Sequence, residues 1–310
     1  MTDLRQAVDD YLRLRRSLGH QMAEAAYLLP DFAAFLDGRG EQTVTIAAAL
    51  DWVKTREPGA VTTASPRRIT AVRGFARYLS GTDPGTEVPP LGLVPYRQRR
   101  GRIFLYSDAD ISAIMAAAKQ TIPQPLRAAT YHCLIGLVAA AGLRIGEAIK
   151  LDRDDIDWAE GVLHIRETKF GKSRLVPLHD SVMNALREYD TLRGRLMPAP
   201  RDPSFFVSLT GKRLIYAVVC PTFRGLVDAA GVGLGAPHPP RLHELRHTFA
   251  VRTLLHWYRT EGNIQAKIPS LSTYMGHREP ACTYWYLSAA PELLALAAAR
   301  REDIRKAPRS

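Results

Sequence analysis

The chain has 310 residues, 46% of them hydrophobic, which is enough for two domains with separate cores. Its net charge of +11 indicates a polyanionic partner, and the whole excess lies in residues 97–310, because residues 1–96 contain 11 basic and 11 acidic side chains. Three cysteines without C-x-x-C spacing argue against a disulfide framework or a thiolate zinc site, and the absence of a long apolar run argues against a membrane span or signal peptide, so we expect a cytoplasmic protein.

The first 80 residues predict a small domain of about four helices. Residues 4–18 place their apolar side chains on one stripe of a helix: Leu4, Val8, Tyr11, Leu12 and Leu18. Further helices are predicted around residues 23–36, 46–55 and 66–79, with glycine, threonine or proline between them.

The stretch from Gly81 to Gly101 is rich in proline and glycine and has no apolar periodicity, which is typical of an interdomain linker. Four arginines crowd its end: Arg97, Arg99, Arg100 and Arg102. A run of charge is often only solvated, but its position between two domains favours contact with a phosphate backbone. We therefore predict a helical domain over residues 1–82, a basic linker over 83–103 and a second domain over 104–310.

The second domain is predicted to be mostly helical with a small hairpin. Ser107 can cap one helix, and a nearly all-apolar helix over residues 126–141 ends at Gly142, after which Glu147 can pair with Arg144. Two strands, 162–165 and 174–178, flank a connection that carries Lys169 and Lys172. Helices are also predicted at residues 181–195, at 215–230 and from about residue 291.

The stretch Arg241-Leu-His-Glu-Leu-Arg-His-Thr-Phe-Ala250 permits two chemistries. On a helix, His243 shares a face with both Arg246 and His247. His-Glu-Leu-Arg-His satisfies the H-E-x-x-H zinc pattern, with Glu244 as the base. Alternatively, Arg246 can fork onto a phosphate while His243 handles a proton. A solvated face rich in histidine and arginine is the third interpretation.

Five motifs in order resemble the tyrosine recombinase (phage integrase) family. They are Ala-Gly-Leu-Arg144-Ile-Gly-Glu, the lysine hairpin, His243-Glu-Leu-Arg246-His247, Met-Gly-His277, and Tyr286 nine residues further on. Each motif alone is weak, but the set is specific and covers nearly the whole chain. The resemblance implies a mainly α fold, in which a SAM-like core-binding domain precedes an α-rich catalytic domain with a small β-hairpin or sheet. This is the DNA breaking-rejoining enzyme fold.

The resemblance also implies a role for each motif. Arg144 and Arg246 would clamp the scissile phosphate, Tyr286 would attack the phosphorus, and His243 would take the phenolic proton. Lys169 would protonate the leaving 5′-oxygen, with Lys172 as the runner-up, and His277 would bond the phosphate. Glu147 and His247 would support these groups. The covalent 3′-phosphotyrosyl bond conserves bond energy, so no cofactor or metal is expected.

Three alternatives stay open on the sequence. Tyr284 competes with Tyr286 as nucleophile, although nine residues from His277 is the family spacing. A zinc hydrolase using His243 and His247 is disfavoured, because Arg246 would face the metal and only Glu261 offers a third ligand downstream. A catalytically silent DNA-binding protein is the remaining class. By resemblance, the partners are double-stranded DNA and a homo-tetramer on paired DNA sites, with no membrane.

Overall fold

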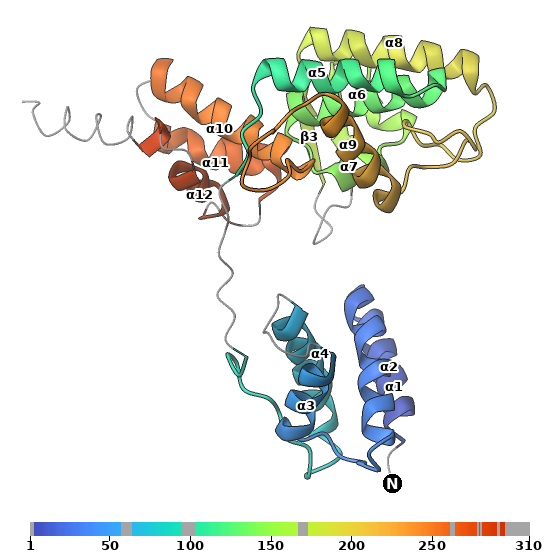
Figure 1. The fold of residues 1–310 in the computed structure, drawn as a ribbon, viewed down its shortest axis with the longest axis vertical. Helices are drawn as coiled ribbons and strands as arrows, with labels where there is room; N and C mark the ends of the chain where they lie inside the picture. Colours follow the sequence, from blue (N-terminus) through green and yellow to red (C-terminus); the bar gives the residue numbers. More distant parts are fainter. Residues whose placement is uncertain are drawn as a thin grey trace, which may run out of the picture. The chain divides into compact units, whose positions relative to one another are not determined.

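The computed structural model describes residues 3–56, 64–94, 103–166, 173–260, 264–277, 279, 281–289 and 292–294. The chain divides into two compact units, Met1–Gly101 and Arg102–Ser310 (Figure 1). Both are mainly helical and the second contains one small sheet, so the predicted fold class is confirmed. None of the helices in these described ranges is long and apolar enough to cross a membrane.

The first unit is a helical bundle. Its helices are α1 (Leu4–Ser17), α2 (Ala23–Asp37), α3 (Ile46–Arg56) and α4 (Ala64–Leu79), which match the four predicted segments. Apolar faces at helical spacing meet in one core, where Phe32, Trp52 and Phe75 have no exposed surface. One detail of the prediction is wrong. Leu18 is 63% exposed, because α1 ends at Ser17 and Leu18 is the C-cap residue.

The second unit is built around a central buried helix. Its helices are α5 (Asp108–Thr121), α6 (Pro125–Ala141), α7 (Ile145–Lys150), α8 (Asp180–Leu196), α9 (Tyr216–Ala229), α10 (His243–Thr260), α11 (Ile264–Met275) and α12 (Ala281–Ala289). Helix α6 contacts α5, α8 and α10, which explains why its sequence is apolar nearly all round. Ser107 caps α5 as predicted, through a capping box with Asp110.

A three-stranded antiparallel sheet lies in the same unit, in the order β1 (Ile156–Asp157), β2 (Val162–Ile165) and β3 (Arg174–Pro177). The two predicted strands are confirmed, whereas β1 has only two residues and was too short to show a period. The register pairs Ile165 with Arg174. Arg174 therefore stands at the first position of β3, a strand that contacts α11.

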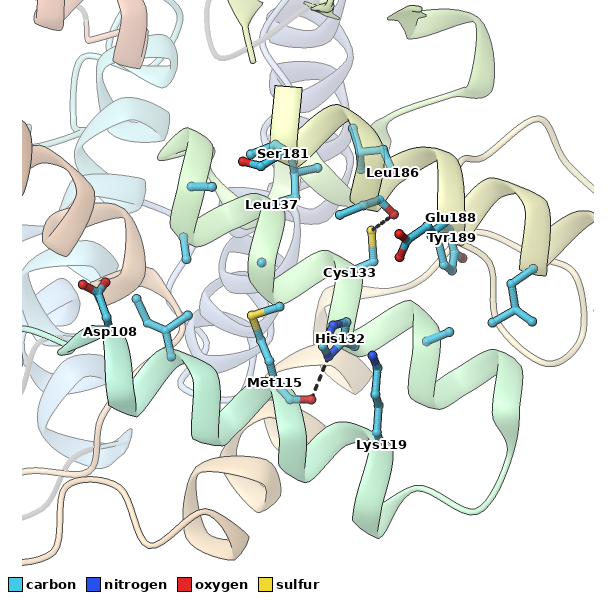
Figure 2. A pocket seen from close by; sticks show the side chains of 18 of the residues that line it. Asp108, Met115, Lys119, His132, Cys133, Leu137, Ser181, Leu186, Glu188 and Tyr189 are labelled. Atoms are coloured by element: carbon cyan, nitrogen blue, oxygen red, sulfur yellow. Dashed lines mark hydrogen bonds between the residues drawn. The ribbon is translucent and has the colours of Figure 1, made fainter. Parts of the chain in front are cut away.

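A cavity of about 430 Å³ lies between α5, α6 and α8 (Figure 2). Met115, Leu137 and Leu186 contribute apolar surface, and charged side chains such as Lys119 also line it. His132 Nδ1 lies 2.9 Å from the carbonyl oxygen of Met115, which can only accept, so this nitrogen carries the proton. None of the residues predicted as site residues lines this cavity. The candidate site is therefore elsewhere on the unit.

The last three helices share a separate apolar core. Leu254 of α10, Ile268 and Leu271 of α11 and Tyr286 of α12 are all buried in it. In Figure 1 these helices group together at one side of the unit, away from α8. This packing brings the Arg241–Ala250 stretch against α12, although the two are about 40 residues apart in sequence.

Candidate functional site

A glycine turn presents Arg144. Helix α6 ends at Gly142, whose φ is 60°, and a Cβ at this position would lie 2.4 Å from the Phe249 ring. Helix α7 begins directly afterwards with Arg144 as its N-cap. Arg144 donates its backbone N–H to Glu147 Oε2 at 2.9 Å and its Nη1 to Glu147 Oε1 at 2.6 Å. The predicted pair is present, and it fixes the direction of the guanidinium.

Arg246 meets Arg144 at the turn that follows α11. Its side chain is buried, with Nη1 donating to the Gly142 carbonyl at 2.7 Å and Nη2 to the Met275 carbonyl at 2.5 Å. Arg144 donates Nη2 to the next carbonyl, that of Gly276, at 2.7 Å. Burial and the charge of Arg144 lower the pKa of Arg246 to about 10, which still leaves it protonated at neutral pH.

Helix α10 places two histidines beside the tyrosine of α12. The rings of His243 and His247, one helical turn apart, lie 4.6 Å apart edge to face. His247 Nδ1 is 2.9 Å from the Tyr286 hydroxyl. Tyr286 is only 2% exposed, whereas Tyr284 is 45% exposed, because two residues on a helix point about 200° apart. Of the two tyrosines, Tyr286 is the one directed into the cluster.

His277 completes the cluster from the same turn. It follows Gly276, and its Nδ1 lies 2.7 Å from the hydroxyl of Thr283, which is fully buried. Its ring stacks on that of Tyr286, with centroids 6.0 Å apart. The turn after α11 therefore carries His277 and supplies carbonyl oxygens to Arg144 and Arg246.

The electrostatic field of the site is strongly positive. Burial and the charges of neighbouring arginines lower the pKa of His277 to about 4. Burial, His243 and Arg246 lower the pKa of His247 to about 3. Loss of hydration and the charges of Arg246, Arg144 and Arg241 also lower the pKa of His243, although part of that side chain is exposed. All three histidines are therefore neutral at pH 7 and can accept a proton.

The tyrosine is held in its neutral form. Burial raises the pKa of Tyr286 above its usual value, and the charge and hydrogen bond of Arg246 oppose that rise only in part. The phenol therefore needs a proton acceptor before it can act as a nucleophile. With His247 neutral, the hydroxyl donates to its Nδ1 across the 2.9 Å contact.

Seven of the predicted residues are thus brought into one cluster: Arg144, Glu147, His243, Arg246, His247, His277 and Tyr286. Six others lie outside the described residues, and nothing is assigned to them from the structure: Arg97, Arg99, Arg100, Arg102, Lys169 and Lys172.

Sequence reasoning missed two residues of the cluster. Arg174 was only the first residue of the predicted strand 174–178, yet its Nη2 donates to Glu147 Oε2 at 2.8 Å. A charged residue that opens a largely apolar strand was the available signal. Thr283, which contacts His277, gave no signal, because a threonine in a helix is common and its partner lies six residues away.

The zinc interpretation finds no support in this geometry. Within the described parts of the chain, no group of three or more histidine, cysteine, aspartate or glutamate side chains could hold a metal ion. Glu244 points instead to the Arg241 backbone N–H, at 2.8 Å, and bonds its guanidinium. Glu261, the third ligand considered, lies outside the described residues.

The cluster suits an anion that carries a reactive centre. Two guanidinium groups can fork onto the oxygens of a phosphate, and charge-assisted bonds of this kind contribute about 1.5–3 kcal/mol each. A phenol hydroxyl and neutral histidines lie beside them, so a nucleophile and proton acceptors are available at the same place. Such an arrangement suits an enzyme of the class that attacks a phosphodiester through tyrosine.

Comparison with known proteins agrees with this class. The model of the phage integrase family matches residues 105–292, which include the whole described cluster. The chain is 42% identical to the putative integrase/recombinase y4rB of Sinorhizobium fredii, over 97% of this chain and 98% of that protein. It is 29% identical to the tyrosine recombinase XerD of Pseudomonas aeruginosa, over 89% of each chain.

Among solved structures, the integrase of the Tn1549 transposon in complex with transposon right end DNA has a similar fold. The TM-score is 0.68 at 16% identity, over 99% of this chain and 100% of that one. The chain belongs to the phage integrase family, the tyrosine recombinases, which are enzymes that cleave and rejoin DNA strands. The resemblance drawn from the five sequence motifs is confirmed at the level of the family.

Proposed function

We propose that this chain is a site-specific recombinase that cleaves duplex DNA through Tyr286 and rejoins it in DNA integration, excision or transposition. The observation that carries the proposal is the Tyr286 hydroxyl, which lies 2.9 Å from a neutral histidine beside two buried or half-buried arginines. A phenol in such a field can be deprotonated, and the resulting oxyanion faces groups that bind phosphate.

The chemical step is a transesterification. Tyr286 Oη forms a bond to the scissile phosphorus as the bond from phosphorus to the 5′-oxygen breaks, which leaves a 3′-phosphotyrosyl link. Arg144 and Arg246 stabilise the extra charge on the nonbridging oxygens, and His277 bonds one of them. Lys169 supplies the proton to the leaving 5′-oxygen. Religation reverses each proton transfer, so the reaction needs no metal and no ATP.

Two histidines compete for the phenolic proton. The family resemblance assigns this role to His243, which is partly exposed and one helical turn from His247. The observed contact instead joins the hydroxyl to His247. We propose that His243 takes the proton once DNA is bound, and that His247 holds the hydroxyl before that point. The Tyr286 hydroxyl must then leave its buried position to reach the phosphorus.

The DNA interface draws on both units. The whole excess of 11 positive charges lies in residues 97–310, and the arginines at 97, 99, 100 and 102 lie at the end of the predicted linker. We assign core binding to residues 1–82, the linker to 83–103 and catalysis to 104–310. The similar Tn1549 integrase is in complex with DNA, which supports duplex DNA as the partner. Strand exchange between two DNA sites requires four protomers, two for each site.

The test is covalent trapping on a selected site. A random duplex library is first enriched for the sequences that the protein binds. The most enriched sequence is then prepared with a nick near the cleavage position, so that the short cleaved end diffuses away and religation is prevented. Wild type and Tyr284→Phe should form an adduct in EDTA, seen by mass spectrometry as a phosphotyrosine at Tyr286, whereas Tyr286→Phe should not. An adduct that persists in Tyr286→Phe, or tight binding with no adduct in any variant, overturns the proposed chemistry.

A further inference from the structure

Three consecutive carbonyl oxygens at the end of α11 each accept a hydrogen bond from a different arginine. Tyr274 accepts from Arg174 Nε at 2.7 Å, Met275 accepts from Arg246 Nη2 at 2.5 Å, and Gly276 accepts from Arg144 Nη2 at 2.7 Å. The last carbonyls of a helix have no partner within the helix and carry partial negative charge. Three guanidinium groups therefore converge on the one turn that leads to His277.

Glu147 ties two of these guanidinium groups together. Arg174 holds both carboxylate oxygens, with Nη2 to Oε2 at 2.8 Å and Nη1 to Oε1 at 3.1 Å. Arg144 Nη1 shares Oε1 at 2.6 Å. Burial would raise the pKa of Glu147, but the hydrogen bonds and charge of Arg174, together with the hydrogen bonds of Arg144, outweigh this effect and lower the pKa to about 2. The carboxylate is thus charged, and its orientation is fixed from two sides.

Arg174 differs from Arg144 in how it uses its donors and in its exposure. All three of its nitrogens are engaged, with Glu147 or with the Tyr274 carbonyl, and its side chain is 11% exposed. The Arg144 side chain is 33% exposed. Arg174 is therefore less available than Arg144 to bind a phosphate. Its position instead determines where Glu147, and through it Arg144, can point.

Gly276 provides independent support that this packing is specific. Its φ is 65°, and a Cβ built there would lie 2.8 Å from Arg174 Nη1 and 3.3 Å from Arg144 Nη1. The two guanidinium groups therefore occupy the space that any side chain at 276 would need. The glycine between Met275 and His277 is explained by this close approach as well as by its backbone conformation.

We propose that Arg174 is a positioning residue for strand cleavage. Through Glu147 it aligns Arg144, and through its bond to the Tyr274 carbonyl it anchors the turn that carries His277. The inference rests on the proposed function and adds a residue that the five motifs do not assign. Lysine cannot replace it, because an ammonium lacks the planar fork that spans both carboxylate oxygens and a carbonyl. Misplacement of a reacting group by about 1 Å can cost on the order of 100-fold in rate.

The chain offers a matched control. Arg213 also bridges a carbonyl and a carboxylate, with Nη1 to Ile149 O at 3.1 Å and Nη2 to Asp152 Oδ1 at 2.7 Å. It makes no contact with the site cluster among the bonds of the described residues. Arg213→Lys also removes a guanidinium group that bridges a carbonyl and a carboxylate. It therefore measures the general cost of losing such a bridge away from the site cluster. Arg174→Lys retains the charge and tests the fork at the site.

The experiment measures DNA affinity and single-turnover adduct formation at saturating DNA for full-length wild type and both variants, on the nicked selected site. We expect Arg174→Lys to bind DNA within about threefold of wild type and to cleave about 100-fold more slowly. We expect Arg213→Lys to stay within about threefold on both measures. A cleavage rate of Arg174→Lys within threefold of the wild-type rate overturns the proposal. A loss of rate that is fully explained by weaker DNA binding, or by the fraction of the variant that is unfolded, overturns it as well.

A second readout needs no activity. Carboxyl chemical shifts of Glu147, assigned through Glu147→Gln, report its pKa in the DNA-free protein. Loss of the fork in Arg174→Lys should raise that pKa towards its usual value, whereas Arg213→Lys should not change it; an unchanged pKa in Arg174→Lys overturns the positioning argument. If wild type forms no adduct, the proposed function fails, and the titration alone still decides whether Arg174 holds Glu147.

Discussion

Replacement of Glu147 by glutamine tests the electrostatic organisation of the site. The carboxylate is 7% exposed and bonds two guanidinium groups, Arg144 and Arg174, which lower its pKa from 4.5 to about 2. A shift of this size corresponds to about 3 kcal/mol of stability, at 1.36 kcal/mol per pKa unit. Glutamine keeps the shape but leaves two guanidinium groups without a counter-charge. We expect the free energy of unfolding at pH 7 to fall by about 3 kcal/mol.

The sign of the pH dependence follows from the direction of the shift. Because the folded pKa is lower than the unfolded pKa, the contribution of Glu147 is fully present above pH 4.5 and is lost as the pH falls towards 2. About 2 kcal/mol of it should disappear between pH 6 and pH 3 in wild type. Glutamine does not titrate, so Glu147→Gln should lack this part of the pH dependence.

The assay is urea unfolding at several pH values, followed by tryptophan fluorescence. The chain has four tryptophans, and only Trp52 lies in the first unit, so a Trp52→Phe background reports on the unit that contains Glu147. Asp228→Asn serves as the control, because its ion pair with Arg224 lies on the surface and contributes little. Parallel pH profiles for wild type and Glu147→Gln between pH 3 and pH 6 would refute the reasoning.

Three further predictions concern the same unit. His243→Gln should slow adduct formation at saturating DNA more than His247→Gln, since in the proposed mechanism His243 takes the phenolic proton. Equal or reversed losses in single-turnover assays would assign the proton to His247. Gly276→Ala should reduce the cleavage rate about 100-fold. The double variant Gly276→Ala/Arg174→Lys should cleave no more slowly than either single variant, because both substitutions displace the same turn. His277 should stay neutral down to about pH 5 by NMR titration, because its pKa is lowered to about 4, and titration near pH 6.5 would contradict the field described for the site.

Local signals were enough to predict most helices. Four segments of the first 80 residues have apolar faces at helical spacing, and each forms a helix within about two residues of its predicted bounds. The prediction for Leu18 was wrong because apolar periodicity cannot distinguish the last residue of a helix from the first residue beyond it. Strand β1 was not predicted, because Ile156–Asp157 is too short to show an alternation of apolar and polar side chains.

Side-chain contacts between distant segments were beyond local reasoning. The pair Arg144 and Glu147 is three residues apart on one helix start, and the sequence predicted it. The bond from Arg174 to Tyr274 spans 100 residues, and that from Arg246 to Met275 spans 29. Such contacts depend on how β3 and α10 pack against the end of α11, which no periodicity specifies. The family motifs indicated which residues converge, but not which carbonyl each would bond.

The charge of the cluster suits the transition state better than the bound substrate. Within the described residues it contains three guanidinium groups and one carboxylate, and the histidines are neutral because the pKa of each is lowered. The sum is two positive charges. A phosphodiester brings one negative charge, and its pentavalent transition state approaches two, so a net positive site stabilises the transition state more than the bound substrate. A site complementary to the transition state accelerates the reaction, whereas one complementary to the ground state only strengthens binding. Arg174 then has a second consequence, because it adds a positive charge to the field without occupying the place of the phosphate.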